Sequence, residues 1–419
     1  MKTKASIIII LAVALLISCV SCQSAVKPPS VEAPPSEESI ALFDTVAKAS
    51  AGLSSEVRKA QMGFALRMLQ ALNDEHKDDN VVLSPQSIST ALGMTYIGAK
   101  GETADEMAKV LGIEGLTMGD VASGYKRMAG ALTDSGDTKV ENANAIWVDE
   151  GFPIVGGFQS TMEGAFLAPV NSIDLQGDKA LPTINGWIKK NTNDMIDKLF
   201  TEPFGDLDRV VLCNAIFFDG KWTMPFDPEC TYDAPFDGKG NVKMMKSEEP
   251  VQGKVGEGYT SVMLPYGDDE RFSMVAVLPE GDVNTFIQGL DEDAFLELFK
   301  GYEEKDEAIV MLPKFKIDEK VSLKDTLKAM GMVIPFDGER ANFDNMGPEL
   351  SISDVLHRAR IEVDEVGTKA AAVTGVVMKC ESAPMDQFIF RADRPFVFFI
   401  YDSQEQLVLF SAKVTQIKD

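Results

Sequence analysis

Histidine is the side chain most often used for acid and base catalysis near neutral pH, and this sequence contains only two. His76 lies in the acidic segment 73–79, which is typical of a solvated loop, and His357 lies far from it in the sequence. A Ser/His/Asp triad needs one of them, yet neither stands in a nucleophile elbow. There is also no HExxH sequence, phosphate-binding loop or dinucleotide fingerprint. We therefore expect no enzyme, no cofactor and no metal site.

The cysteines offer no redox or metal framework either. Their spacing shows no paired pattern, and the CxxC formed by the first two has a simpler explanation in the N-terminal segment described below. Cys213 sits in an apolar run and is expected to be a small buried residue. The sequence contains five cysteines, Cys19, Cys22, Cys213, Cys230 and Cys380.

The segment 365–378 has the composition of a strand that is not yet part of a sheet. It begins with Glu365, passes through Gly367 and is then small and β-branched, with no proline before Pro384. A segment that must slide between existing strands needs all of its backbone N–H groups and small side chains. Alternate side chains of a strand face opposite sides. If this segment enters a sheet, the side chains on its buried, inward face are uncharged and mostly small. That inward set would be Thr368, Ala370, Ala372, Thr374 and Val376.

The N-terminus has the layout of an export signal. Lys2 and Lys4 precede an apolar run over residues 7–17 that is too short to span a bilayer. The sequence LISC at 16–19 matches the lipobox of exported prokaryotic lipoproteins, in which the cysteine is acylated. The alternative is an ordinary cleavage site near a spare cysteine. We predict a signal peptide over 1–18 and lipidation of Cys19, with the protein exported and held at the cell envelope, or extracellular.

Residues 19–54 are expected to form a stalk and lead-in, because four prolines among serines and glutamates leave too little apolar surface to fold. The lipid anchor would then be the sole attachment to a membrane. The formal net charge of −25 is spread along the chain. Such an excess of acidic groups disfavours binding to nucleic acid or to anionic membrane surfaces.

Hydrophobic periodicity predicts the elements that would position these residues. A helix is expected over 57–72, and a short strand over 81–83 should turn into a helix that Ser84 caps and Pro85 begins. Further predictions are a helix over 182–199 and a buried hairpin of 396–401 with 407–410. Extended runs are expected over 210–218, 272–278 and 308–315. Several helices followed by many strands predict an α+β domain.

Separate blocks of this sequence, in order, resemble the serpin family of protease inhibitors. The resemblance covers about residues 55–419 and implies the serpin fold, with about nine helices around three β-sheets, in a monomer. An exposed reactive-centre loop is implied over about 365–390. The blocks are NVVLSPQSISTALGM at 80–94, GAKGETA at 98–104, NAIFFDGKW at 214–222, LPKF at 312–315 with LKDTL at 323–327, LHRARIEVDEVGT at 356–368 and FRADRPF at 390–396.

The resemblance also implies a role for individual positions. Trp222 matches the tryptophan of the breach, where loop insertion begins, and a polar cluster matches the shutter, where the strands part. The family mechanism is suicide inhibition: a protease is acylated on the loop, which then inserts as a new strand and traps a covalent acyl complex. The shutter positions are Ser84, Ser87, Asn214 and His357, and the hinge positions are Glu365, Gly367, Thr368, Ala370, Ala371, Ala372 and Thr374.

The cleaved bond is less closely defined. In inhibitory members it lies about 14 residues past the hinge glycine, which places it at Glu381–Ser382 and favours a target with a basic specificity pocket. Because the segment that follows is somewhat longer than in many members, cleavage after Cys380 or Met378 stays open. An elastase-like target that accepts Val377 or Met378 is a further alternative.

The resemblance is also compatible with two other functions. A non-inhibitory serpin would act as a binding or chaperone-like protein, but such members carry bulky or charged residues at inward hinge positions. Lys369 stands where many members have a glutamate, but in a strand its side chain would face outward. Inhibition of cysteine proteases, which the family sometimes shows, is also open. We expect a target serine endopeptidase as the partner.

Overall fold

The computed structural model describes residues 7–19, 54–133, 138–366 and 387–417. Within these ranges the chain forms helices and three β-sheets, so the expected α+β class is confirmed. The helices are α2 (Ser55–Glu75), α3 (Pro85–Gly98), α4 (Gly101–Leu111), α5 (Met118–Thr133), α6 (Gly156–Ala165), α7 (Ala180–Asn191), α8 (Val283–Gly289), α9 (Glu292–Glu297) and α10 (Lys324–Ala329), with short 3-10 turns at η1 (Pro228–Cys230) and η2 (Ile334–Phe336).

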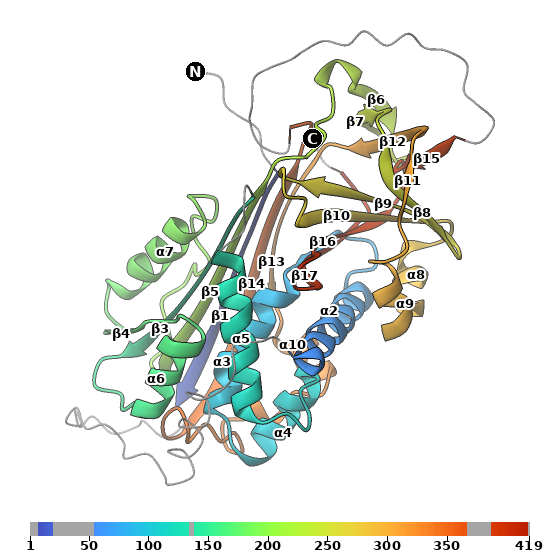
Figure 1. Cartoon of the computed structure of the whole chain (residues 1–419). Helices are drawn as coiled ribbons and strands as arrows, with labels where there is room; N and C mark the ends of the chain where they lie inside the picture. The colour runs from blue at the N-terminus through green and yellow to red at the C-terminus, as the bar shows by residue number, and fades with distance from the viewer. Residues whose placement is uncertain (1–6, 20–53, 134–137, 367–386, 418–419) are drawn as a thin grey trace.

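The largest feature of the fold is a six-stranded sheet with long central strands (Figure 1). Its order is β13 (Phe315–Ser322), β14 (Leu350–Val363), β1 (Ile7–Cys19), β5 (Asp208–Gly220), β3 (Lys139–Asp149) and β4 (Val170–Ile173). Neighbouring strands are antiparallel except for the parallel pair β3 and β4. Strands distant in the sequence therefore meet at the centre of the sheet.

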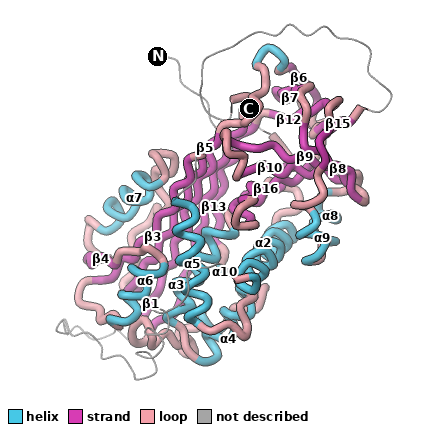
Figure 2. The backbone as a smooth tube through the Cα atoms, viewed as in Figure 1, coloured by secondary structure: helices cyan, strands magenta, loops and turns pink. Residues whose placement is uncertain are grey.

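Two smaller sheets complete the fold. The seven-stranded sheet has the order β11 (Glu303–Lys305), β8 (Val251–Gly256), β9 (Tyr259–Tyr266), β10 (Phe272–Pro279), β16 (Phe396–Asp402), β17 (Leu407–Val414) and β2 (Val81–Leu83). The four-stranded sheet has the order β15 (Phe388–Arg391), β12 (Ala308–Pro313), β7 (Asn241–Ser247) and β6 (Tyr232–Pro235). Figure 2 shows that the end of the molecule near β6, β7 and β15 consists mainly of strands.

The side chains of β5 show how the large sheet is covered on both faces. Val210 and Leu212 belong to the core that includes α3, whereas Val211 and Cys213 pack with residues of α7. This alternation follows from the two-residue period of a strand. The expected burial of Cys213 is confirmed, since its side chain is fully buried. At β5 the sheet is thus covered by helices on both faces.

Several elements follow local signals in the sequence. The predicted helix over 57–72 lies within α2, and the predicted turn into α3 is present, with the Ser84 hydroxyl accepting a hydrogen bond from the Ser87 N–H at 3.0 Å. Pro85 occupies the first turn, where its missing N–H removes no helical bond. The predicted hairpin is also confirmed as the buried antiparallel pair β16 and β17.

Two predicted boundaries are wrong. The helix expected over 182–199 ends at Asn191, because Asn193 and Asp194 adopt positive φ angles of 52° and 64°, which an α-helix cannot contain. The run expected as one strand over 308–315 is divided between two sheets. Lys314, between β12 and β13, donates its backbone N–H to the Lys243 carbonyl at 2.7 Å as the chain crosses over.

Residues 7–19 hold the described part of the signal peptide predicted over 1–18, together with Cys19, and they form β1 at the centre of the large sheet. Cleavage after residue 18 and lipidation of Cys19 stay predictions, because a strand in the uncleaved chain tests neither. Since β1 lies between β14 and β5, both of these strands are paired on both edges.

Candidate functional site

The candidate site begins where β14 ends, at the breach predicted around Trp222. The indole N–H of this buried tryptophan donates to the backbone carbonyl of Asp364 at 3.0 Å. Its ring stacks on Tyr266 with centroids 4.6 Å apart. Burial raises the pKa of the Asp364 carboxyl. These contacts hold the first residues after β14 against the body of the protein.

Glu365, the next residue, is held by side chains from two other parts of the chain. Its carboxylate contacts the Lys314 ammonium at 2.7 Å and accepts a hydrogen bond from the Thr231 hydroxyl at 2.7 Å. The Phe226 N–H donates to its backbone carbonyl at 2.8 Å. Burial by itself would raise the pKa of Glu365, but the hydrogen bonds from Lys314 and Thr231 outweigh it and leave the pKa below its usual value. The carboxylate is therefore charged at neutral pH.

We call Trp222, Thr231, Lys314, Asp364 and Glu365 the hinge latch. They come from segments well apart in the sequence and meet at the end of β14 from which the predicted loop departs. The ion pair is partly shielded, with 9% of the Glu365 side chain and 36% of the Lys314 side chain exposed. The hinge latch therefore fixes the base of the loop through charge and hydrogen bonds.

The shutter residues lie further along the same sheet, underneath its centre. The Ser87 hydroxyl of α3 donates to the Asn214 side-chain carbonyl of β5. The Asn214 amide in turn donates to Asn142 at 2.8 Å and to Asn144 at 2.6 Å, both on β3. Ser84 joins through its bond to the Ser87 N–H. Three of the four predicted shutter residues thus form one hydrogen-bonded cluster.

His357, the fourth, is close in the sheet but is not part of this cluster. Its side chain is fully buried, and neither imidazole nitrogen has a hydrogen-bond partner among the described residues. Burial lowers its pKa from 6.5 to about 3, so the ring is neutral at physiological pH. In the sheet its Cα lies opposite Val13 of β1 and Val321 of β13.

Sequence reasoning missed five residues of these two clusters, among them Asp364, which directly precedes the predicted hinge residue Glu365. Asn142 and Asn144 alternate along β3, and that period could have indicated a shared polar face opposite Asn214. Lys314 lies within the LPKF block, yet its contact with Glu365 depends on a crossing between sheets. No local signal indicates Thr231.

The remaining hinge and reactive-bond predictions lie outside the described residues. They concern the segment 367–386, whose flanking residues Val366 and Gln387 are described. The predicted residues within it are Gly367, Thr368, Ala370, Ala371, Ala372, Thr374, Met378, Cys380, Glu381 and Ser382.

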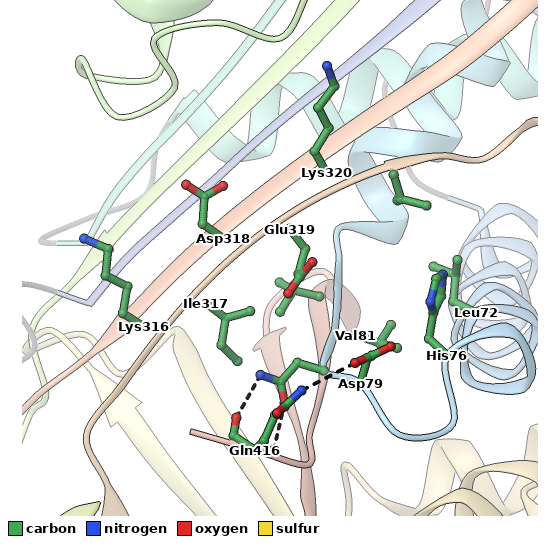
Figure 3. A pocket seen from close by; sticks show the side chains of 13 residues that line it. Leu72, His76, Asp79, Val81, Lys316, Ile317, Asp318, Glu319, Lys320 and Gln416 are labelled. Atoms are coloured by element: carbon green, nitrogen blue, oxygen red, sulfur yellow. Dashed lines mark hydrogen bonds between the residues drawn. The ribbon is translucent and has the colours of Figure 1, made fainter. Parts of the chain in front are cut away.

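A cavity of about 540 Å³ lies away from the hinge latch, between the edge strand β13 and the segment from α2 to β2 (Figure 3). His76 is one of the residues that line the cavity, and no serine is among the other described residues that line it. Its charged side chains are largely paired, since Lys316 contacts Glu362 at 2.7 Å and Asp318 contacts Arg358 at 2.9 Å. The cavity is therefore a polar hollow at a sheet edge and contains no catalytic arrangement among its described residues.

No group of three or more histidine, cysteine or acidic side chains is arranged to hold a metal ion in the part of the chain that the structure describes. Among the helices described, none combines the length and the apolar character needed to cross a membrane.

Comparison with known proteins shows the family to which this chain belongs. The family described as Serpin (serine protease inhibitor) matches residues 59–417. The chain belongs to the serpin family. Iripin-5 of Ixodes ricinus is 34% identical to this serpin over 378 residues, which cover 87% of this chain and 95% of the tick protein. Serpin B6 of Pongo abelii is 32% identical and covers 84% of this chain and 96% of its own length.

Solved structures of serpins share the fold along most of this chain. Native tengpin, a thermophilic serpin, superposes with a TM-score of 0.77 at 26% identity and covers 96% of this serpin and all of its own chain. Thyroxine-binding globulin in complex with thyroxine superposes with a TM-score of 0.75 at 23% identity, a likeness of fold alone. The expected architecture of helices around three sheets is thereby confirmed.

Proposed function

We propose that this serpin is a suicide-substrate inhibitor of an extracellular serine endopeptidase and acts as a monomer. The observation that carries the proposal is the position of Glu365. It lies just beyond the end of β14, beside the position between β14 and β5 that we call the slot, and the hinge latch holds it there. The loop that follows therefore starts at the place from which a strand could enter between β14 and β5.

The proposed chemistry belongs to the protease and the trap to the serpin. The protease serine oxygen attacks the carbonyl carbon at the scissile bond, the peptide bond breaks, and the new amine leaves with a proton. The freed segment then pairs with β14 and β5 before water can hydrolyse the ester, and the attached protease is displaced. The uncharged inward residues from Thr368 to Val376 support this step, because each would face the interior of the sheet.

For the cleaved bond we propose Glu381–Ser382, with Cys380 and Met378 as the alternative residues before it. An acidic residue at that position would suit a protease whose specificity pocket is basic. Inhibition of a cysteine protease would use the same loop, with a thioester in place of the ester. Whether a serine or a cysteine protease is trapped therefore depends on which protease accepts the loop sequence as a substrate.

We also propose export, removal of residues 1–18 and lipidation of Cys19. The support is the order of charge, apolar run and LISC in the sequence. The relatives named above come from a tick and a primate and do not bear on a prokaryotic lipoprotein. The folded part would stand away from a membrane on the stalk of residues 19–54, in reach of extracytoplasmic proteases.

The test uses the form beginning at Gln23 with elastase-, chymotrypsin-, trypsin-, glutamyl- and papain-type proteases. We expect a denaturant-stable complex at the summed mass and a released peptide that starts near Ser382, both detectable by electrophoresis and mass spectrometry. Thr368→Arg places a long charge at the first inward position and should convert the inhibitor into a substrate. The matched control Lys369→Arg changes an outward residue and should still form the complex.

Two results would contradict the proposal. Stable complexes formed equally well by Thr368→Arg would exclude loop insertion as the trap. Clean cleavage in residues 367–386 without a complex, across the whole panel, would favour a non-inhibitory serpin that acts as a binding or chaperone-like protein.

A further inference from the structure

The slot between β14 and β5 is already filled in this chain. β1 pairs with β14 from Ile8, opposite Glu362, to Cys19, opposite Leu350. On its other edge it pairs with β5 from Ile7, opposite Gly220, to Ser18, opposite Asp208. Both pairings are antiparallel and extend along nearly the whole length of the strand (Figure 1).

This position is the one that the reactive loop needs. The loop leaves β14 after Val363 and would have to return antiparallel to β14 in order to pair with it. Its other edge would have to pair with β5, because the two strands flank the same slot. The backbone donors and acceptors on those edges already bond to β1, and each edge can hold one strand. Occupation by β1 and insertion of the loop therefore exclude each other.

β1 also begins at the end of the sheet where the loop begins. Ile7 is opposite Gly220, two residues before Trp222, and Ile8 is opposite Glu362, three residues before Glu365. Both of these partners lie next to the hinge latch. The first loop residues to enter the sheet would thus meet the first residues of β1.

The match between β1 and the slot is incomplete at its centre. His357 lies opposite Val13, a residue type without a polar side-chain atom, and both imidazole nitrogens of His357 lack a partner among the described residues. A buried polar group without a hydrogen bond disfavours the arrangement that buries it. The segment 7–17 contains no polar residue at all. The backbone of β1 thus occupies the slot while the imidazole of His357 has no hydrogen-bond partner among the described residues.

We propose that residues 7–19 are an intramolecular inhibitor of loop insertion, so that the chain can trap a protease only after this segment has been removed or withdrawn. The proposal rests on the proposed function, since it regulates the same slot. Cleavage before Cys19 would remove all of β1 except its last residue. Removal of the leader would thereby couple export to activity, and an uncleaved chain would not react with proteases inside the cell.

The test compares four proteins produced without export: the full-length chain, the form beginning at Gln23, and full-length Leu11→Pro and Leu11→Val. Leu11 lies opposite Ala359 of β14 and Ile216 of β5, in the middle of β1. Proline removes a ladder N–H there and should expel the strand, whereas valine retains the N–H and a high strand propensity. Leu11→Val is therefore the matched control.

The first measurement is hydrogen exchange of the β14 and β5 amides that face the slot. In the full-length chain and Leu11→Val these amides should exchange at least about tenfold more slowly than in the Gln23 form and Leu11→Pro. Unprotected amides of residues 8–18 in the full-length chain would overturn the proposal, because they would show that this segment does not pair with β14 and β5.

The second measurement detects insertion of the cleaved loop through the Tm and does not require formation of a protease complex. The loop is cut within residues 367–386, and the Tm is compared before and after. Cleavage should raise the Tm of the Gln23 form and of Leu11→Pro by at least about 5 °C, as a strand is added, and leave the other two proteins nearly unchanged. An equal rise in all four would overturn the inhibitor role and leave the proposed function intact. No rise in any form would overturn both proposals.

Discussion

Replacement of His357 by leucine should remove much of the acid sensitivity of this serpin. The imidazole is fully buried without a hydrogen-bond partner among the described residues, and burial lowers its pKa from 6.5 to about 3. Between these two pH values the unfolded chain binds a proton that the folded chain cannot accept. Folding stability must therefore rise with pH across this window, and acid must destabilise the protein.

The magnitude follows from the two pKa values. Each factor of ten in proton affinity is worth about 1.4 kcal/mol, so the full window from pH 6.5 to pH 3 corresponds to about 5 kcal/mol. Between pH 7 and pH 5 the contribution of His357 amounts to about 2 kcal/mol, because the unfolded histidine is protonated over most of that interval. Leucine carries no titratable group and should abolish this part of the pH dependence.

The assay is urea unfolding of the full-length chain, in which His357 is buried, at pH 7 and pH 5, with recovery checked on dilution. The wild type should lose about 2 kcal/mol more than His357→Leu between the two values, while the contribution of the carboxylates is common to both. His76→Gln is the matched control, since His76 has 40% of its side chain exposed and is the other histidine of the sequence. An equal loss of stability in wild type and His357→Leu would refute the assignment.

Three further predictions concern the clusters and the thiols. Asn214→Ala removes the side chain that links Ser87 to β3 and should cost about 2–4 kcal/mol in urea unfolding; a loss below about 0.5 kcal/mol would contradict the role of this cluster. Glu365→Gln and Lys314→Met, combined in a double-mutant cycle, should show a coupling of about 1 kcal/mol for their partly exposed ion pair, and additive losses would exclude it. Cys230 is exposed, whereas burial raises the pKa of the Cys213 thiol, so a thiol reagent followed by peptide mapping should label Cys230 alone of the two until urea is added.

Local signals were sufficient for elements whose ends depend on neighbouring residues. The Ser84 cap and Pro85 define the start of α3 through bonds within one turn, and the apolar period of 57–72 lies within α2. The C-terminal hairpin follows in the same way, because its two buried strands are separated by a short polar turn. These contacts join residues that are close to one another in the sequence, so a local sequence pattern can predict them.

The wrong boundaries have a tertiary origin. Asn185 lies in α7, and its side-chain carbonyl accepts bonds from the Leu199 and Phe200 N–H groups, so the chain after Asn191 folds back as a loop instead of continuing the helix. At Lys314 the chain passes from the four-stranded to the six-stranded sheet. The apolar pattern is the same on either side of that crossing and does not reveal it.

By itself the sequence determined the family and the composition of the predicted hinge, because these reside in short blocks whose order along the chain is the evidence. Only the tertiary structure decided which side chains meet. Thr231 reaches Glu365 from the segment just before β6, and Lys314 reaches it from the crossing between β12 and β13. Asn142 and Asn144 of β3 accept hydrogen bonds from the Asn214 amide. The tertiary structure also decided the place of residues 7–19, since an apolar run suits either a lipid bilayer or a buried slot, and strand pairing with β14 and β5 distinguishes the two.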